Sequence, residues 1–187
     1  MSVAIDPNTA VNQLADRFWE GVLERDPLYS TVLGDERYND RWPDLGPDGR
    51  AADEAALREM LSDARAITTD GLDPEQVITR DMLMVVGENY VEAYAQKQYQ
   101  LSLDHMSGPQ IWPAQAAQYQ PADTPERLEK LLTRYRTYPG LIEQHIGALD
   151  EGVREERTAA EAPVRRAIEQ VERLLGMPVE QAPAVTT

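Results

Sequence analysis

The chain has 187 residues, with 33 acidic and 18 basic side chains and a formal net charge of -15 at pH 7. Nucleic acids and anionic membrane surfaces both attract basic faces, so this excess of carboxylates argues against either partner. The absence of cysteine excludes disulfides, thiolate nucleophiles and cysteine-ligated metal sites.

The N-terminal segment MSVAIDPNTA lacks both the basic and the apolar parts of a signal peptide. No apolar run approaches the length of a membrane span. We therefore expect a cytoplasmic protein of the bacterial type.

Helix signals follow one another from the N-terminus. Asp6-Pro7 is a helix start, and apolar residues at spacings of three and four predict a helix from about Pro7 to Arg25. Asp26-Pro27 repeats the start signal, and Gly34 supplies a stop. Proline and glycine breakers over residues 43–49 then predict a loop.

Two long helices are predicted next. The first should run from about Arg50 to Thr68, with one side formed by Ala56, Met60, Ala64 and Ile67. The second should start at Asp73-Pro74 and reach about Leu101. Its apolar positions are broadly spread, which predicts a central, well-covered helix; they are Ile78, Met82, Val85, Val86 and Ala93.

The C-terminal half begins with an irregular segment, Asp104 to Pro121. Thr124-Pro125 opens another helix, with a kink or short break expected at Pro139-Gly140. The face of that helix is expected to hold Leu128, Leu131, Leu132, Tyr135 and Tyr138. A final helix takes the apolar residues from Val164 to Leu175.

These patterns predict an all-α fold, an irregular bundle of five to seven helices with two structured loops that contain Pro and Gly. Residues 1–176 would form one helical lobe. The polar, proline-rich residues 177–187 would form a linker or a disordered tail.

The first structured loop follows Gly34 and carries residues 35–44; it is unusual for a solvent loop because it holds two arginines and two large aromatics within eight residues. Aromatic side chains with polar groups favour one buried end and one hydrogen-bonded end. We expect the loop to fold back on the protein, with Arg37 and Arg41 holding carboxylates of the loop or of a partner domain and with Tyr38 and Trp42 packed beneath.

The second loop offers His105, Gln110 and Trp112 as polar or aromatic contacts in a cleft. The alternative for His105 is a helix C-terminal residue favoured by the helix dipole. For Trp112 the alternative, a cap on the core, is the more common use of such a residue. His145 lies at the edge of an apolar helical face and is consistent with a half-buried, hydrogen-bonded side chain.

Established catalytic motifs are missing. The sequence contains no H-E-x-x-H helix, no glycine-rich phosphate loop and no G-x-S-x-G turn. A carboxylate-bridged di-iron bundle needs Glu three residues before His, but Ser102 and Ile142 occupy those positions. We therefore assign no catalytic residue and no metal ligand in this chain.

Three segments, taken in order, resemble the N-terminal region of a large bacterial family, domain of unknown function 885, which looks like a gluzincin-type zinc metallopeptidase. They are LADRFWEGVLERDPLYSTVLGDERYNDRWPDLGP, LDHMSGPQIWPAQAAQY and the long stretch from TPERLEKLLTRYRTYPG to VERLL. One departure is Glu155-Glu156, where relatives tend to have small residues and glycine.

This resemblance implies a helical lobe that forms one wall of a substrate cleft. The zinc motif of the family lies in a later part that cannot be mapped onto this chain, so zinc is expected only in a full-length member and no cofactor is expected here. The partners would be a missing C-terminal catalytic domain or another protein, with a peptide as substrate. The substrate-binding candidates are Arg37, Tyr38, Trp42, His105, Gln110 and Trp112.

Two other hypotheses stay open. The chain would be a free-standing all-α protein-interaction module if its loops or an exposed apolar helix face bind a partner. It would be a small independent enzyme if His105 acts with nearby acids.

Overall fold

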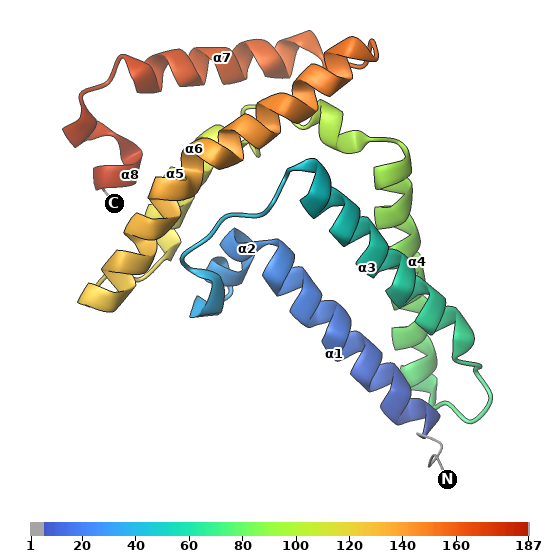
Figure 1. The fold of residues 1–187 in the computed structure, drawn as a ribbon. Helices are drawn as coiled ribbons and strands as arrows, with labels where there is room; N and C mark the ends of the chain where they lie inside the picture. The colour runs from blue at the N-terminus through green and yellow to red at the C-terminus, as the bar shows by residue number, and fades with distance from the viewer. Residues whose placement is uncertain (1–5, 187) are drawn as a thin grey trace. The chain divides into compact units, whose positions relative to one another are not determined.

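A computed structural model describes residues 6–186, and the described chain is all-α, without a strand (Figure 1). This confirms the predicted fold class. Eight α-helices are present in this range: α1 Pro7–Arg25, α2 Pro27–Val32, α3 Pro47–Ala66, α4 Pro74–Ala95, α5 Trp112–Tyr119, α6 Pro125–Arg154, α7 Glu161–Leu175 and α8 Pro183–Thr186. Four short 3-10 helices join them: η1 Glu36–Tyr38, η2 Gln98–Leu101, η3 Pro109–Ile111 and η4 Val179–Gln181.

Local capping explains several of the helix boundaries. The Asp26 carboxylate accepts a hydrogen bond from the Tyr29 amide, and the Thr124 hydroxyl accepts one from the Arg127 amide. Proline follows each cap at the first helical position, where its missing N–H is harmless. The stop predicted at Gly34 is confirmed, because this glycine has a φ of 85° just after α2.

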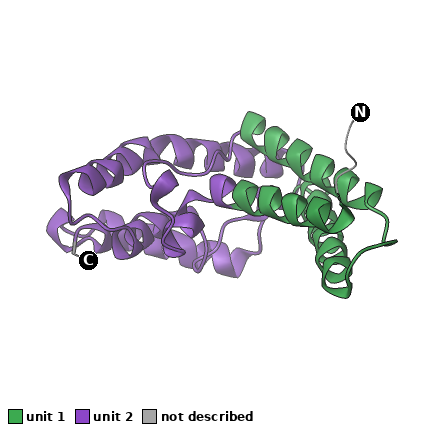
Figure 2. Cartoon of the chain, turned by 90° about the horizontal axis from the view of Figure 1, so that it is seen from below, with its two compact units in different colours: residues 1–22, 47–97 green, residues 23–46, 98–187 purple. Residues whose placement is uncertain are grey.

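The chain divides into two compact units (Figure 2). The first unit contains residues up to 22 and residues 47–97, and its core consists of Leu14, Leu57, Met60, Ala64 and Leu83. In this unit α3 packs against α4 at Gly87, where a Cβ atom would lie 2.8 Å from the Met60 Cε. Glycine therefore permits the close approach of these two helices.

The second unit contains residues 23–46 and residues from 98 onward. Its core joins α2, the first loop, α5 and α6, and consists of Leu28, Trp42, Ala116, Leu131 and Leu141. Residues 177–186 form η4 and α8, and α8 packs on α5. The boundary at residue 176 between a lobe and a tail stays a prediction.

The structure corrects several predicted elements. Helix α3 begins at Pro47, earlier than predicted, because proline at the first helical position starts the helix rather than breaking it. Its buried side uses Leu57 and Leu61 in place of the exposed Ala56. Helix α4 ends at Ala95 instead of about Leu101, because Lys97 adopts a left-handed φ of 50°.

Helix α4 also differs from its predicted burial. Ile78, Met82 and Val85 are 61%, 61% and 57% exposed, so the helix is not well covered. Its buried residues, Leu83 and Gly87, lie on the opposite side. The apolar residues go around the whole helix, and the pattern alone did not show which side packs.

Two predictions for the C-terminal half are also wrong. The segment predicted as irregular contains η3 and α5. Helix α6 runs unbroken from Pro125 to Arg154, so the alternative of a short break at Pro139-Gly140 is wrong, while the alternative of a kink stays a prediction. Over residues 6–186, no helix combines the length and apolar character needed to cross a bilayer.

Candidate functional site

The first loop is fixed on α6 by Arg134, whose side chain is 0% exposed. Its Nε donates to the Arg41 carbonyl at 3.0 Å, and its Nη2 donates to the carbonyls of Pro27 and Tyr38 at 3.1 and 2.8 Å. Its Nη1 donates to the Thr31 hydroxyl at 3.0 Å. One guanidinium therefore holds α2 and the first loop together at four points.

These four acceptors are neutral oxygens, and none is a carboxylate. Burial lowers the pKa of Arg134 to about 10, a cost that the more distant charge of Asp40 partly offsets. The side chain still stays protonated at neutral pH. Neutral carbonyls suit the planar donor fork of arginine, which makes this residue a structural clamp.

Trp42 completes the same clamp from the loop side. Its indole Nε1 donates to the carbonyl of Arg134 at 2.6 Å, and the side chain is 7% exposed. The Arg134 guanidinium lies 5.3 Å from the Trp42 ring. The predicted packing of Trp42 beneath the loop is confirmed.

The structure brings the two loops together through their aromatic residues. The rings of Trp42 and Trp112 stack with centroids 6.3 Å apart, and Tyr138 tilts against Trp42 at 5.6 Å. The Tyr138 hydroxyl donates to the Pro109 carbonyl, and burial raises the pKa of Tyr138 to about 12. Trp112 is partly buried and packs against the core of the second unit. This confirms the prediction of a cap on the core.

Arg37, Tyr38 and Arg41 form the outer side of the first loop. The Tyr38 ring lies between the two guanidiniums, 5.3 Å from that of Arg37 and 4.7 Å from that of Arg41. Arg37 binds the Asp35 carboxylate at 2.6 Å, and Arg41 lies 3.8 Å from the Glu24 carboxylate. Arg37 therefore holds a carboxylate of the loop, as predicted, whereas the carboxylate near Arg41 belongs to α1. Both arginine side chains stay about half exposed, and Tyr38 lies between them on the outer side, not beneath the loop as predicted.

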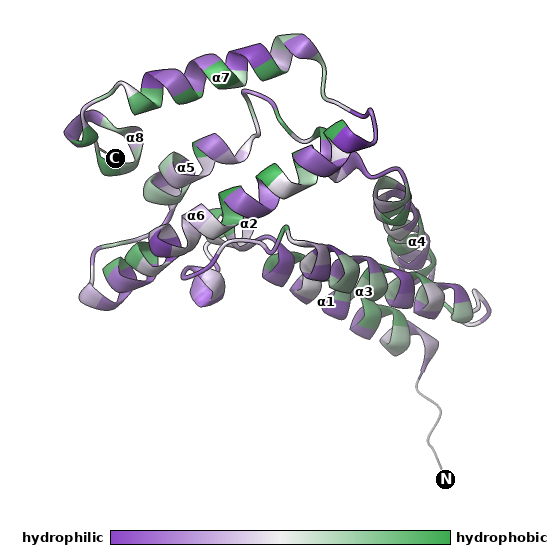
Figure 3. Cartoon of the chain, turned by 45° about the horizontal axis from the view of Figure 1, so that its top comes forward, coloured by the Kyte–Doolittle hydropathy of each residue, from purple (hydrophilic) through white to green (hydrophobic). Residues whose placement is uncertain are grey.

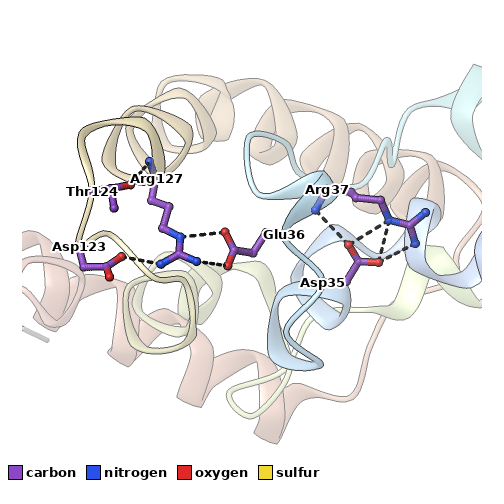
Figure 4. A network of polar contacts seen from close by, with 6 residues as sticks. All are labelled: Asp35, Glu36, Arg37, Asp123, Thr124 and Arg127. Atoms are coloured by element: carbon purple, nitrogen blue, oxygen red, sulfur yellow. Dashed lines mark hydrogen bonds and ion pairs between the residues drawn. The ribbon is translucent and has the colours of Figure 1, made fainter.

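Figure 4 shows the ionic contacts on either side of η1. The Arg37 guanidinium and amide both donate to Asp35, which holds the pKa of this carboxyl below its usual range. On the other side, Arg127 on α6 binds Glu36 at 2.7 Å and Asp123 at 2.9 Å. The second contact set ties η1 to the start of α6.

The second loop is fixed by hydrogen bonds that run through two glutamines. Gln110 Nε2 donates to the Asp104 carbonyl at 2.7 Å and to Gln170 Oε1 at 3.1 Å. Gln170 Nε2, on α7, donates to the His105 carbonyl at 3.0 Å. Gln110 thus links the loop to α7, whereas Trp112 links it to Trp42.

The two histidines differ from the predicted contacts. His105 is half-buried, and its Nδ1 is buried without a hydrogen-bond partner among the described residues. His145 is 6% exposed, its Nε2 likewise has no partner among residues 6–186, and burial lowers its pKa. His145 is therefore more buried than the predicted half-buried side chain. The predicted hydrogen bond is not formed at its Nε2 by any of the described residues. No group of three metal-ligating side chains occurs in the described part of the chain.

Sequence reasoning missed Arg134, the residue that organises the first loop. Leu128 and Leu132, predicted on the apolar face of α6, are 44% and 39% exposed. Leu131 is buried as predicted, and the buried side also contains Arg134 and Leu141. The spacing of three residues from Leu131 was a signal, but the charge of arginine made it look like a surface residue.

The fold and these contacts define an all-α protein whose two Pro- and Gly-containing loops are fixed on one long helix. Residues 27–187 match the sequence model of a protein family, which is described as bacterial protein of unknown function (DUF885). Because this match covers most of the chain, the chain belongs to that family. A search of curated proteins found no match.

Proposed function

We propose that this chain is the helical lobe of a zinc-metallopeptidase-like hydrolase and forms one wall of its substrate cleft. The proposal is supported by the ordered resemblance of the three sequence segments and by the preorganised first loop. A wall must hold its shape without ligand, and the buried contacts of Arg134 and Trp42 supply that rigidity.

The single observation that carries the proposal is the division of the first loop into two sides. Its inner side is locked by Arg134, while Arg37 and Arg41 expose about half of each side chain on its outer side. Guanidiniums beside the Tyr38 ring suit peptide carbonyls and carboxylates. We assign direct substrate contact to Arg37 and Tyr38, and a supporting role to Trp42 and Trp112.

The residues of this chain do not fit a zinc site. Among residues 6–186, no three His, Asp or Glu side chains come together as ligands. The lobe therefore acts by positioning substrate.

Reading the coding sequence beyond Thr187 tests the proposal. We expect an open frame that encodes an H-E-x-x-H helix, and a frame without one would overturn the proposal. In a protein that carries both regions, Arg37→Ala should raise the KM for a peptide about tenfold, whereas Arg58→Ala on α3, a similarly exposed ion-paired arginine, should leave it unchanged. Equal effects of the two substitutions would contradict the role of the loop.

A free-standing interaction module is the second candidate function. The exposed Ile78, Met82 and Val85 on α4 favour it. Light scattering and thermal melting separate the two: a cooperative, monodisperse monomer supports a self-sufficient module, and aggregation supports a lobe that needs covering.

A further inference from the structure

Helix α7 presents an apolar stripe that the second unit does not cover. Val164, Ile168, Val171 and Leu175 share one face of the helix, and Ile168 and Leu175 are 52% and 82% exposed. Hydrophobic and hydrophilic residues alternate along α7, as the colours of Figure 3 show. Only Ala167 is buried on this helix.

The contacts of α7 explain why the stripe stays open. Gln170 is half-buried and binds both Gln110 and the carbonyl of His105, so this edge of the helix is fixed to the second loop. Ala167 packs on the same side, one helical turn away. The stripe therefore keeps its orientation without being covered.

A cavity of about 500 Å³ lies at the N-terminal end of the stripe. Its apolar walls come from Leu149 and Val153 of α6, from Leu103, and from Val164 of α7. Arg157 Nε donates to Gln100 Oε1 at 3.0 Å along its lining, which fixes the polar side of the cavity. The volume falls within the range of about 300–1,000 Å³ typical of ligand pockets, large enough for aliphatic side chains of a partner.

The cavity lining holds one carboxylate, Glu161, and one guanidinium, Arg157. Carboxylates are in excess further along the stripe, where the surface beside Val164 and Ile168 is lined by Glu161, Glu169 and Glu172 against Arg165. Glu161 pairs with Arg165, yet carboxylates remain in excess. This local charge has the same sign as the net charge of -15 of the chain.

We propose that this surface, the α6–α7 groove, binds a basic amphipathic helix of another protein. Its aliphatic side chains would enter the cavity beside Val153 and continue along Ile168 and Leu175, while lysines or arginines face the carboxylates of Glu161, Glu169 and Glu172. A second copy of this chain is disfavoured because it would bring two of these acidic surfaces and two charges of -15 together. The inference rests on the second unit alone and does not depend on the proposed function.

A synthetic helix tests this proposal. The probe is a leucine–lysine peptide of about 18 residues with leucines on one face, and the control peptide has the same composition in an order that gives no apolar face. Calorimetry with the full chain should show one-to-one binding of the amphipathic peptide only. Affinity should fall several-fold when NaCl rises from about 50 to about 300 mM.

Two matched variants locate the site. Val153 and Met82 are 62% and 61% exposed, so Val153→Glu and Met82→Glu place the same charge at equally exposed apolar positions. Val153→Glu should weaken binding at least about tenfold, and Met82→Glu should leave it unchanged, with both variants checked for native helicity. Equal binding of both peptides, equal effects of both variants, or a peptide-independent dimer that Val153→Glu disrupts would each overturn the proposal.

Discussion

Replacing Arg134 by methionine tests the clamp on the first loop most severely. Methionine fills a similar space but donates no hydrogen bond, so the carbonyls of Arg41, Pro27 and Tyr38 and the Thr31 hydroxyl each lose one hydrogen bond. Losing a hydrogen bond from a charged, buried donor costs about 2 kcal/mol. Removing the guanidinium recovers about 3 kcal/mol, which corresponds to the lowering of its pKa from 12.5 to about 10. The expected net loss is about 5 kcal/mol.

Urea unfolding followed by circular dichroism and tryptophan fluorescence measures this loss, which should also lower the Tm by about 10–20 °C. Arg136→Met is the matched control, because Arg136 lies on the same helix, α6, just after Arg134. Its side chain is 63% exposed and forms a surface ion pair with Glu129. That change should cost less than about 0.5 kcal/mol. If Arg134→Met is as mild as the control, the buried clamp does not hold the loop and the reasoning fails.

Three further predictions concern other positions. Trp42→Ala should cost about 3–5 kcal/mol of unfolding free energy and Trp42→Phe clearly less, as measured by urea titration; a neutral Trp42→Ala would show that the loop is solvated surface. Glu156 has a left-handed φ of 58°, so Glu156→Gly should raise the Tm and add about 1 kcal/mol to the free energy of unfolding. Glu155→Gly, at a φ of -95°, should not raise the Tm. A lower Tm for Glu156→Gly would contradict the strain argument. Burial lowers the pKa of His145 in the folded protein below its value of 6.5 in the unfolded chain. As the pH falls through this range the unfolded state binds the proton first, so the stability of the folded state decreases with decreasing pH. Between about pH 7.5 and 5.5, His145→Gln should remove part of this slope in denaturation curves, and an unchanged slope would refute it.

The sequence was sufficient for elements that local chemistry defines. The Asp26-Pro27 start and the Gly34 stop predicted α2, and α1 has its predicted bounds, because caps, prolines and glycines act within one helical turn. Glu155-Glu156 was noted as a departure from the family pattern, and Glu156 takes the left-handed conformation that glycine adopts easily.

Features that depend on distant contacts were not predictable in this way. Arg134 is buried because carbonyls more than ninety residues away in the chain surround it, and no local pattern announces them. The same reason applies to α4, whose packed side is chosen by Met60 and Leu61 of α3 meeting Gly87. The sequence offers Trp42 and Trp112 as core-packing or ligand-binding side chains, but their stacking follows only from the fold of the second unit.

Hydrogen exchange at the Trp42 indole N–H tests the central claim most directly, since the claim is that the first loop is a fixed part of the core. The chain has three tryptophans, so three indole signals in a nitrogen–proton correlation spectrum follow all of them at once. The Trp42 N–H, buried against the Arg134 carbonyl at 2.6 Å, should exchange slowest, with a protection free energy close to that of unfolding the second unit. Exchange of the Trp42 signal as fast as that of Trp19, whose side chain is 45% exposed, would contradict the account.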